Sequence, residues 1–206
     1  MDPRRIANLL QAFLGDEVLA GDQLTSISIY VDLLLKWNAR MNLTAVRDPE
    51  QIVRRHFGES LFAARHLLTR DSTDTVTDVG SGAGFPGIPL RLYAPGIQLT
   101  LIEAHGKKAI FLREVCRALK FTNVNIVSAR AEDWGGTANL VTLRAVEKFE
   151  QAFEAAAALV APGGKMAIMI GARQASEVER LAPGSWSDPI VIPESRERVL
   201  RTWQKR

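Results

Sequence analysis

Apolar and polar positions follow two different periods along this chain, and the period changes near residue 70. Before that point, apolar residues recur every three or four positions, which is the helical period. The pattern predicts helices at roughly 3–14, 23–38 and 48–68. The third has a distinct start, because Asp48 can cap it, Pro49 fits its first position and Glu50 complements the helix dipole.

Short apolar runs alternate with helical periods from residue 71 onward. The runs predict strands at 75–79, 98–103, 124–129, 140–145 and 165–171. The segments between and after them predict helices at 86–93, 107–120, 147–160 and 173–182. Strands that alternate with helices indicate a parallel sheet covered on both faces.

The end of the chain has a different pattern. Residues 188–194 and 197–206 are two extended segments with no long helix between them, so we expect an antiparallel hairpin at the sheet edge. The prediction is an α/β fold with a seven-stranded, mostly parallel sheet. We expect an N-terminal helical extension at 1–70 and the sheet-bearing core at 71–206.

Composition and charge narrow the possible classes of protein. The chain has 206 residues, 47% of them hydrophobic, which suffices for one packed core with an appendage. The net charge of +3 is compatible with a nucleic-acid partner but is shared by many enzymes. No apolar run is long enough to cross a membrane, and the first residues fit an amphipathic helix better than an export signal, so we expect a cytoplasmic protein.

Cysteine and histidine give no sign of a metal centre. Cys116 is the single cysteine, which excludes an internal disulfide, and its helical surroundings "LREVCRALK" predict a buried thiol. The three histidines have no metal-ligand spacing among them. We therefore expect no metal.

A cluster of glycines follows the first predicted strand, in "VTDVGSGAGFPGIPLRLY" (76–93). Asp78 precedes Gly80, Gly82 and Gly84, and a helix is predicted directly afterwards. Glycines allow positive φ and let a ligand approach the backbone, and the free N–H groups of the helix face the same crevice. A ligand cradle at the carboxyl end of the strands is favoured over a plain turn, and we expect Asp78 and these glycines to contact the ligand.

The acidic residue Glu103 indicates what this ligand is. It ends the second strand, about twenty positions after the glycines, where a carboxylate can accept both hydroxyls of a ribose. The spacing Gly82-x-Gly84-x-x-Gly87 also satisfies the dinucleotide fingerprint, so an NAD-dependent oxidoreductase remains an alternative. Against it, no hydride-transfer residues are evident, and Asp78 ahead of the glycines resembles the first motif of S-adenosylmethionine methyltransferases.

A further acidic pair lies past the third strand, in "SARAEDW" (128–134). In methyltransferases of this type, an acidic residue at this place lies near the adenine ring, and Ala131 and Glu132 occupy it here. The acidic pair, Glu132 and Asp133, could equally cap a short helix.

Four segments together resemble the ribosomal RNA small subunit methyltransferase G family, also called glucose-inhibited division protein B. They are "WNARMNLTAVRDPEQIVRRHFGESL" (37–61), "TDVGSGAGFPGIPLRLYAPGIQLTLIEAHGKKAIFLREV" (77–115), "SARAEDW" (128–134) and "LRAV" (143–146). The resemblance implies a Rossmann-like fold and methyl transfer from S-adenosylmethionine to the N7 of one guanine in 16S ribosomal RNA. It implies cofactor contacts at Gly80 and the loop to Phe85, at Glu103, at Ala131 and Glu132, and at Arg144.

The implied chemistry needs few catalytic groups. Guanine N7 already carries an in-plane lone pair, so no general base is required, and positioning should dominate. No residue is assigned a catalytic role with certainty; Arg144 is the candidate. Contacts to RNA are expected from basic and polar residues flanking the crevice: Arg40, Asn42, Arg54, Arg55, His56, Lys107, Lys108, Arg198 and Arg201. We expect a monomer acting on small-subunit RNA or the 30S particle. A non-catalytic RNA-binding module is the remaining alternative.

Overall fold

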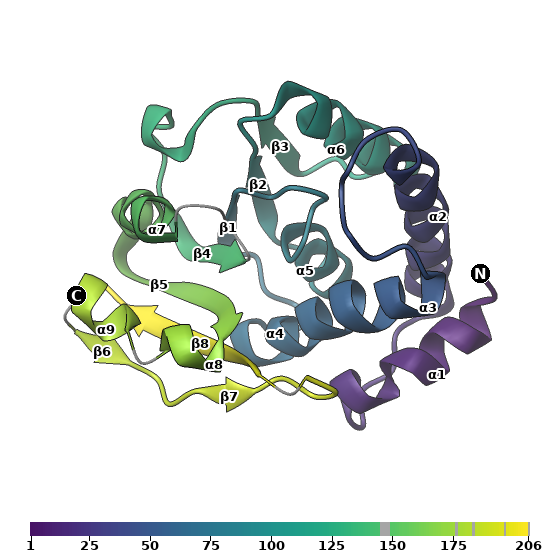
Figure 1. Cartoon of the computed structure of the whole chain (residues 1–206), viewed down its shortest axis with the longest axis horizontal. Helices are drawn as coiled ribbons and strands as arrows, with labels where there is room; N and C mark the ends of the chain where they lie inside the picture. Colours follow the sequence, from purple (N-terminus) through teal and green to yellow (C-terminus); the bar gives the residue numbers. More distant parts are fainter. Residues whose placement is uncertain (145–148, 176, 183, 196, 206) are drawn as a thin grey trace.

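The structure is a computed structural model that describes residues 1–144, 149–175, 177–182, 184–195 and 197–205 (Figure 1). Its first third is helical, as predicted. The helices are α1 (Pro3–Leu14), α2 (Gly21–Asn38), α3 (Pro49–Ile52), the π-helix η1 (Val53–Gly58) and α4 (Glu59–Leu67). The last three run on as one helix, so the prediction at 48–68 is confirmed. Asp48 caps its start by accepting a hydrogen bond from the backbone N–H of Gln51.

Five parallel strands form the centre of the sheet. They are β1 (Thr75–Val79), β2 (Gln98–Ile102), β3 (Val124–Val127), β4 (Ala138–Arg144) and β5 (Val160–Gly171), in the spatial order β3-β2-β1-β4-β5. All five match predicted strands. The order reverses at β1, which places a crevice between the carboxyl ends of β1 and β4.

The predicted antiparallel edge is also present. β8 (Arg198–Gln204) pairs antiparallel with β5, and both β6 (Ser185–Trp186) and β7 (Ile190–Val191) pair antiparallel with β8. Within the described residues the sheet therefore has eight strands rather than seven. The additional strand is β6, and its two residues are too few to show a period in the sequence.

Helices cover both faces of the sheet. The helices α5 (Gly87–Tyr93) and α6 (Gly106–Ala118) lie on one face, while α7 (Phe149–Ala158), α8 (Ala172–Ala175) and α9 (Val178–Leu181) belong to the other. The predicted helix at 173–182 is thus two short helices, and residue 176 between them is outside the described range. So are residues 147 and 148, where another helix was predicted to begin, and residues 145 and 146 of the "LRAV" segment.

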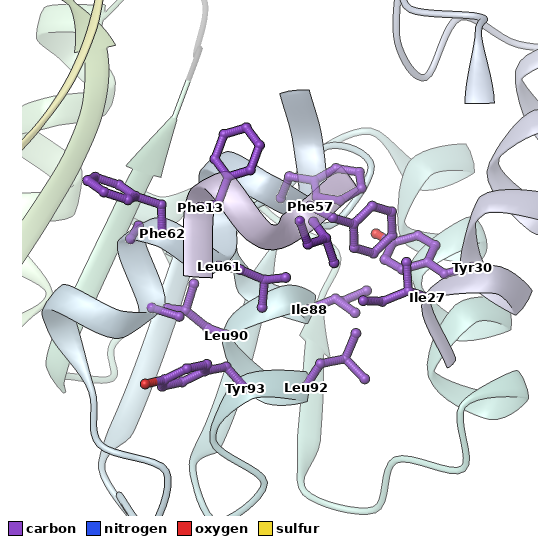
Figure 2. Close-up of a cluster of buried hydrophobic side chains, with 14 of the residues drawn as sticks. Phe13, Ile27, Tyr30, Phe57, Leu61, Phe62, Ile88, Leu90, Leu92 and Tyr93 are labelled. Atoms are coloured by element: carbon purple, nitrogen blue, oxygen red, sulfur yellow. The ribbon is translucent and has the colours of Figure 1, made fainter. Parts of the chain in front are cut away.

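The N-terminal helices share a hydrophobic core with the sheet. Phe13, Tyr30 and Phe57 are fully buried in the same cluster as Ile88 of α5, and Figure 2 shows these side chains converging. This packing sets the segment between α2 and α3, together with η1, beside the carboxyl ends of the strands (Figure 1). The extension therefore contributes directly to the site described next.

Two further sequence predictions can be compared with the structure. Cys116 is buried in α6 as expected, and its burial raises the pKa of the thiol to about 11. Of the helices in the described ranges, none is long and apolar enough to span a membrane.

Candidate active site

The loop between β1 and α5 is built on glycines in the left-handed region. Gly80, Gly82 and Gly84 have φ of 65°, 57° and 90°, which side chains with a Cβ rarely adopt. The loop is tied to the end of β2 by a 3.0 Å hydrogen bond from the Ser81 N–H to the Ile102 carbonyl. The glycine requirement read from the sequence is therefore a requirement of this backbone.

The glycines serve two different neighbours. A Cβ on Gly82 would have only the Gly80 carbonyl oxygen near it, at 3.8 Å, so this residue opens onto a cleft. A Cβ on Gly84 would collide with the Tyr30 hydroxyl, and Gly84 does not line the cleft. Tyr30 reaches the loop from α2 and donates a hydrogen bond to the Ala83 carbonyl. Gly84 is thus needed for packing beneath the loop.

Asp78 also lies beneath the loop and not in the cleft. Its carboxylate is fully buried and accepts hydrogen bonds from the Thr142 hydroxyl, at 2.7 Å, and from the Gly87 N–H, at 3.2 Å. Burial raises the pKa of Asp78 to about 6, against the opposing effect of these hydrogen bonds. Asp78 therefore links β1, β4 and the start of α5, although the sequence suggested a direct cofactor contact.

A cleft of about 1020 Å³ opens at the carboxyl ends of β1 to β4. Seven of the residues expected to contact the cofactor line it: Gly80, Gly82, Phe85, Glu103, Ala131, Glu132 and Arg144. The structure thus brings together residues from the carboxyl end of β4 and from the segments that follow β1, β2 and β3. Lys108 lines the same cleft.

Glu103 connects two of these loops. Its carboxylate accepts one hydrogen bond from the Gly82 N–H and another from the His105 N–H, each at 2.8 Å. The two oxygens therefore orient both the glycine loop and the turn before α6. A carboxylate oxygen can accept two hydrogen bonds, so each oxygen keeps capacity for a ligand.

Ala131 and Glu132 lie on the short helix η2 (Ala131–Asp133) at one end of the cleft. Ala131 is buried and Glu132 is exposed, with its carboxylate 3.4 Å from the amide nitrogen of Gln151. Apolar side chains of Ile102 and Ala155 complete this end. Apolar lining residues beside a polar rim suit a purine base.

The opposite end of the cleft is formed by the N-terminal extension. Asn38 is buried and organises the segment after α2, because its amide donates to the Thr44 carbonyl and accepts from the N–H groups of Leu43 and Thr44. The Thr44 hydroxyl lies 2.8 Å from Nε2 of His56. The His56 ring stacks on Phe85 with centroids 4.9 Å apart.

The environment of His56 keeps its ring neutral. Burial, followed by the positive charges of Arg144, Arg55 and Arg198, lowers the pKa of His56 to about 3. The nearby acid Glu59 is bound to two of these arginines. His56 therefore lines the cleft as an uncharged aromatic ring across the physiological pH range.

Arg144 is held by the helix that contains η1. Nη1 donates to the His56 carbonyl and the Ser60 hydroxyl, and Nη2 donates to the Arg55 carbonyl at 2.7 Å and to Glu59 at 3.0 Å. Burial lowers the pKa of Arg144, partly offset by Glu59. Its four Nη hydrogens are thus engaged within the protein, and among the described residues Nε has no acceptor.

Glu59 is a site residue that the sequence reasoning missed. Its side chain is only 2% exposed, and it pairs with both Arg144 and Arg198. The available signal was an acidic residue among the apolar positions of a helix, between Phe57 and Leu61. Such a residue is seldom buried without a cationic partner.

The residues expected to contact RNA fall into two groups. Arg40, Asn42, Arg55 and Lys107 are exposed, and Lys108 faces the cleft. The others are engaged: Arg54 pairs with Glu194 at 2.6 Å, Arg198 with Glu59, and His56 with Thr44.

Arg201 is not accessible to RNA in this structure. Only 6% of it is exposed, and its guanidinium donates to the carbonyls of Ala175 and Ser187 and to Glu179. Its side chain points toward α8 and α9, which pack beside β8. The alternation of residues along the strand did not reveal on which side of the sheet Arg201 lies. We therefore exclude Arg201 from the candidate RNA surface.

No group of three or more His, Cys, Asp and Glu side chains suited to a metal ion occurs in the part of the chain that the structure describes.

Comparison with known proteins identifies the family. Residues 23–187 match the family model described as rRNA small subunit methyltransferase G. The chain is 39% identical over 166 residues to a ribosomal RNA small subunit methyltransferase G of Desulfitobacterium hafniense, an alignment that covers 78% of this chain and 68% of that protein. A protein of the same name from Xanthomonas campestris is 37% identical over 194 residues, covering 91% of this chain and 87% of the relative.

Solved structures of more distant proteins share the fold. A protein of Agrobacterium tumefaciens described as a predicted O-methyltransferase superposes with a TM-score of 0.59 at 19% identity, covering 71% of this chain and 80% of that chain. TYW2 of M. jannaschii, in complex with AdoMet, gives a TM-score of 0.55 at 15% identity over 71% of this chain and 75% of that one. The fold likeness agrees with the sequence matches, which confirm the resemblance found from the four motifs. The chain belongs to the rRNA small subunit methyltransferase G family.

Proposed function

We propose that this protein transfers a methyl group from S-adenosylmethionine to the N7 of a specific guanine in 16S ribosomal RNA. Membership of the family supports the reaction and the RNA substrate. The observation that carries the proposal in the structure is Glu103, whose carboxylate joins the glycine loop to the wall of a nucleoside-sized cleft.

The cleft residues fit this cofactor. Gly82 leaves open space where a larger side chain would protrude, and Glu103 keeps acceptor capacity for ribose hydroxyls. Ala131 and Glu132 would flank the adenine, beside the apolar Ile102 and Ala155. Asp78 and Gly84 would act indirectly, by holding the loop.

The chemistry places a modest demand on the protein. S-adenosylmethionine, when bound, supplies an electrophilic methyl group on a sulfonium. Guanine N7 has a free in-plane lone pair, so the chain need not remove a proton before transfer. Its residues must instead orient the base and exclude water. Arg144 is a candidate for this positioning, since its Nη groups are fixed in the wall and its Nε–H remains available near the cleft.

The RNA-facing surface follows from the same geometry. Lys108 lines the cleft, and Arg55 lines the neighbouring hollow. Arg40, Asn42 and Lys107 are exposed on segments that lead into Leu43 and Lys108, which line the cleft. These contacts would supply affinity for the RNA backbone without reading sequence. We propose that residues 1–70 supply the RNA-facing loop, that residues 71–206 bind the cofactor, and that a monomer acts on the RNA or the 30S particle in the cytoplasm.

A labelled-methyl assay tests this function. The protein should move a tritiated methyl group from S-adenosylmethionine to 16S RNA or to 30S particles. Gly82→Val should abolish both labelling and calorimetric cofactor binding, because a branched side chain at φ 57° fills the cleft. Gly21→Val is the matched control, since nothing lies within 4 Å of its Cβ position, and it should retain both.

Other outcomes would favour the rival functions. Turnover of a nicotinamide cofactor without labelling would indicate an oxidoreductase. RNA binding without affinity for S-adenosylmethionine would indicate a non-catalytic RNA-binding module. Unlabelled RNA in every form would contradict the proposed transfer.

A further inference from the structure

Three hollows lie along the carboxyl edge of the sheet and share their walls. His56 and Arg144 line both the cofactor cleft and a neighbouring hollow of about 290 Å³. Arg55 and Arg198 line that hollow and a third one of about 450 Å³. The three hollows are therefore continuous neighbours, with His56 between the first two and Arg55 and Arg198 between the last two.

The walls of the three hollows change from aromatic to cationic. On the cleft side, the rings of His56 and Phe85 stack on each other, and both residues line the cleft together with Thr44. On the other side, Arg55 is exposed, and its guanidinium has no partner among the described residues. Arg198 is half-buried and shares the buried Glu59 with Arg144, so the arginines outnumber the acid.

This change of character matches the two parts of a nucleotide. Stacking on aromatic rings is the general way in which proteins hold unstacked bases. An arginine fork suits a phosphate, with charge-assisted hydrogen bonds. A base whose ring atom reacts must leave its stack to enter a cleft of this kind.

This inference rests on the proposed function. We propose that the target nucleotide lies across His56, with its base on the cleft side and its phosphate on the side of the adjoining hollow. Its guanine lies in the end of the cleft bounded by Thr44, His56 and Phe85, and its phosphate lies in the adjoining hollow, bound by Arg55. His56 is then the partner on which the extruded guanine stacks, and Arg55 is the contact that holds the flanking backbone.

The charge state of His56 suits this role. Methylation at N7 leaves the purine ring with a positive charge, which an imidazolium in contact would oppose. Burial, followed by the charges of the surrounding arginines, keeps the imidazole uncharged. These arginines lie on η1, β4 and β8, and His56 lies between their hollow and the cleft, because it lines both.

Substitutions at His56 distinguish stacking from a structural role. His56→Phe keeps the ring and loses the bond to Thr44, whereas His56→Gln keeps a polar group and loses the ring. We expect His56→Phe to retain most of the single-turnover rate on saturating 30S particles. We expect His56→Gln to lose roughly 10- to 100-fold, the range for loss of one stacked base. Cofactor affinity by calorimetry should stay within about twofold in both variants.

Arg55→Ala tests the phosphate contact. Loss of one charge-assisted hydrogen bond should raise the KM for RNA about 10-fold, with little change in the single-turnover rate. Arg117→Ala is the matched control, because this exposed arginine ends α6 at the opposite edge of the sheet, and its KM should equal that of the wild type.

The outcomes separate this proposal from the proposed function. Labelling by the wild type with unchanged kinetics in His56→Gln and Arg55→Ala would overturn the nucleotide site alone. The nucleotide site would also be overturned if His56→Gln kept the activity and His56→Phe lost it. A parallel loss of cofactor affinity would have the same meaning, since either result would make His56 a support for Thr44 or Phe85. Absence of labelling by the wild type would overturn the proposed function and the site with it.

Discussion

Asp78, Gly82 and Gly84 belong to one motif but do three different tasks. Gly82 opens the cleft, Gly84 makes room for Tyr30, and Asp78 holds the N–H of Gly87 from below. Glycine at a given position shows that a Cβ is not tolerated, but the neighbour that excludes it is set by tertiary packing. The motif was therefore predictable from the sequence, whereas the division between ligand-facing and packing roles was not.

The pKa of His56 predicts a pH dependence of stability at the same scale. The folded state binds the proton with a pKa of about 3, against an ordinary value of 6.5, so it favours the neutral ring. The neutral ring therefore contributes fully to the unfolding free energy above pH 6.5, and this contribution is lost as the pH falls from 6.5 toward 3.

Urea unfolding at pH 7.5 and pH 5 measures this contribution. Between these values the wild type should lose about 2 kcal/mol more unfolding free energy than His56→Gln, which has no ring to titrate. His66→Gln is the control, because His66 is exposed, and it should lose as much as the wild type. Equal losses in the wild type and His56→Gln would contradict the shifted pKa.

Helix α2 shapes the glycine loop, although the two are distant in the sequence. The ring of Tyr30 lies parallel to that of Phe85, 5.3 Å away, and its hydroxyl donates to the Ala83 carbonyl. A helix of the N-terminal extension thereby supports the backbone of the glycine loop.

Tyr30→Phe tests the role of α2. The Ala83 carbonyl would lose its buried donor, which should lower the unfolding free energy by about 1–3 kcal/mol and weaken the binding of S-adenosylmethionine. Tyr93→Phe removes a hydroxyl that bonds Glu17, away from the cleft, and should leave cofactor affinity unchanged. Equal cofactor affinity in the wild type and Tyr30→Phe by calorimetry would show that the loop holds its shape without α2.

Element prediction succeeded where the period was long and failed where it was short or altered. Helical periodicity located α1, α2 and the helix from Pro49 to Leu67. The π-helical turn at Val53–Gly58 was not foreseeable, because one wider turn barely changes the apolar spacing. This turn places the carbonyls of Arg55 and His56 on Arg144, so the missed feature belongs to the site itself.

Glu59 connects distant parts of the whole molecule. It lies on α4 and binds Arg144 at the end of β4 and Arg198 at the start of β8. The sheet edge, the central strand and the N-terminal extension therefore meet at one buried carboxylate. Pairing across such a sequence distance cannot be read from local patterns.

Glu59→Gln should destabilise the whole fold. Removing the charge leaves two arginines without their counter-ion in a buried place, for which a loss of about 3–5 kcal/mol in unfolding free energy is expected. Glu154→Gln is the matched control on the exposed side of α7 and should change stability little. A Glu59→Gln variant as stable as the wild type in urea would show that the arginines are neutralised by solvent.

Methyl transfer to guanine N7 is best tested by mapping the methylated atom. A 7-methylguanine is cleaved selectively by borohydride and aniline, and primer extension then locates the break. With the protein and S-adenosylmethionine, we predict one new stop at a single guanine of 16S RNA, absent with Gly82→Val. Tritium incorporated into the RNA without any such stop would place the methyl group on another atom and contradict the account.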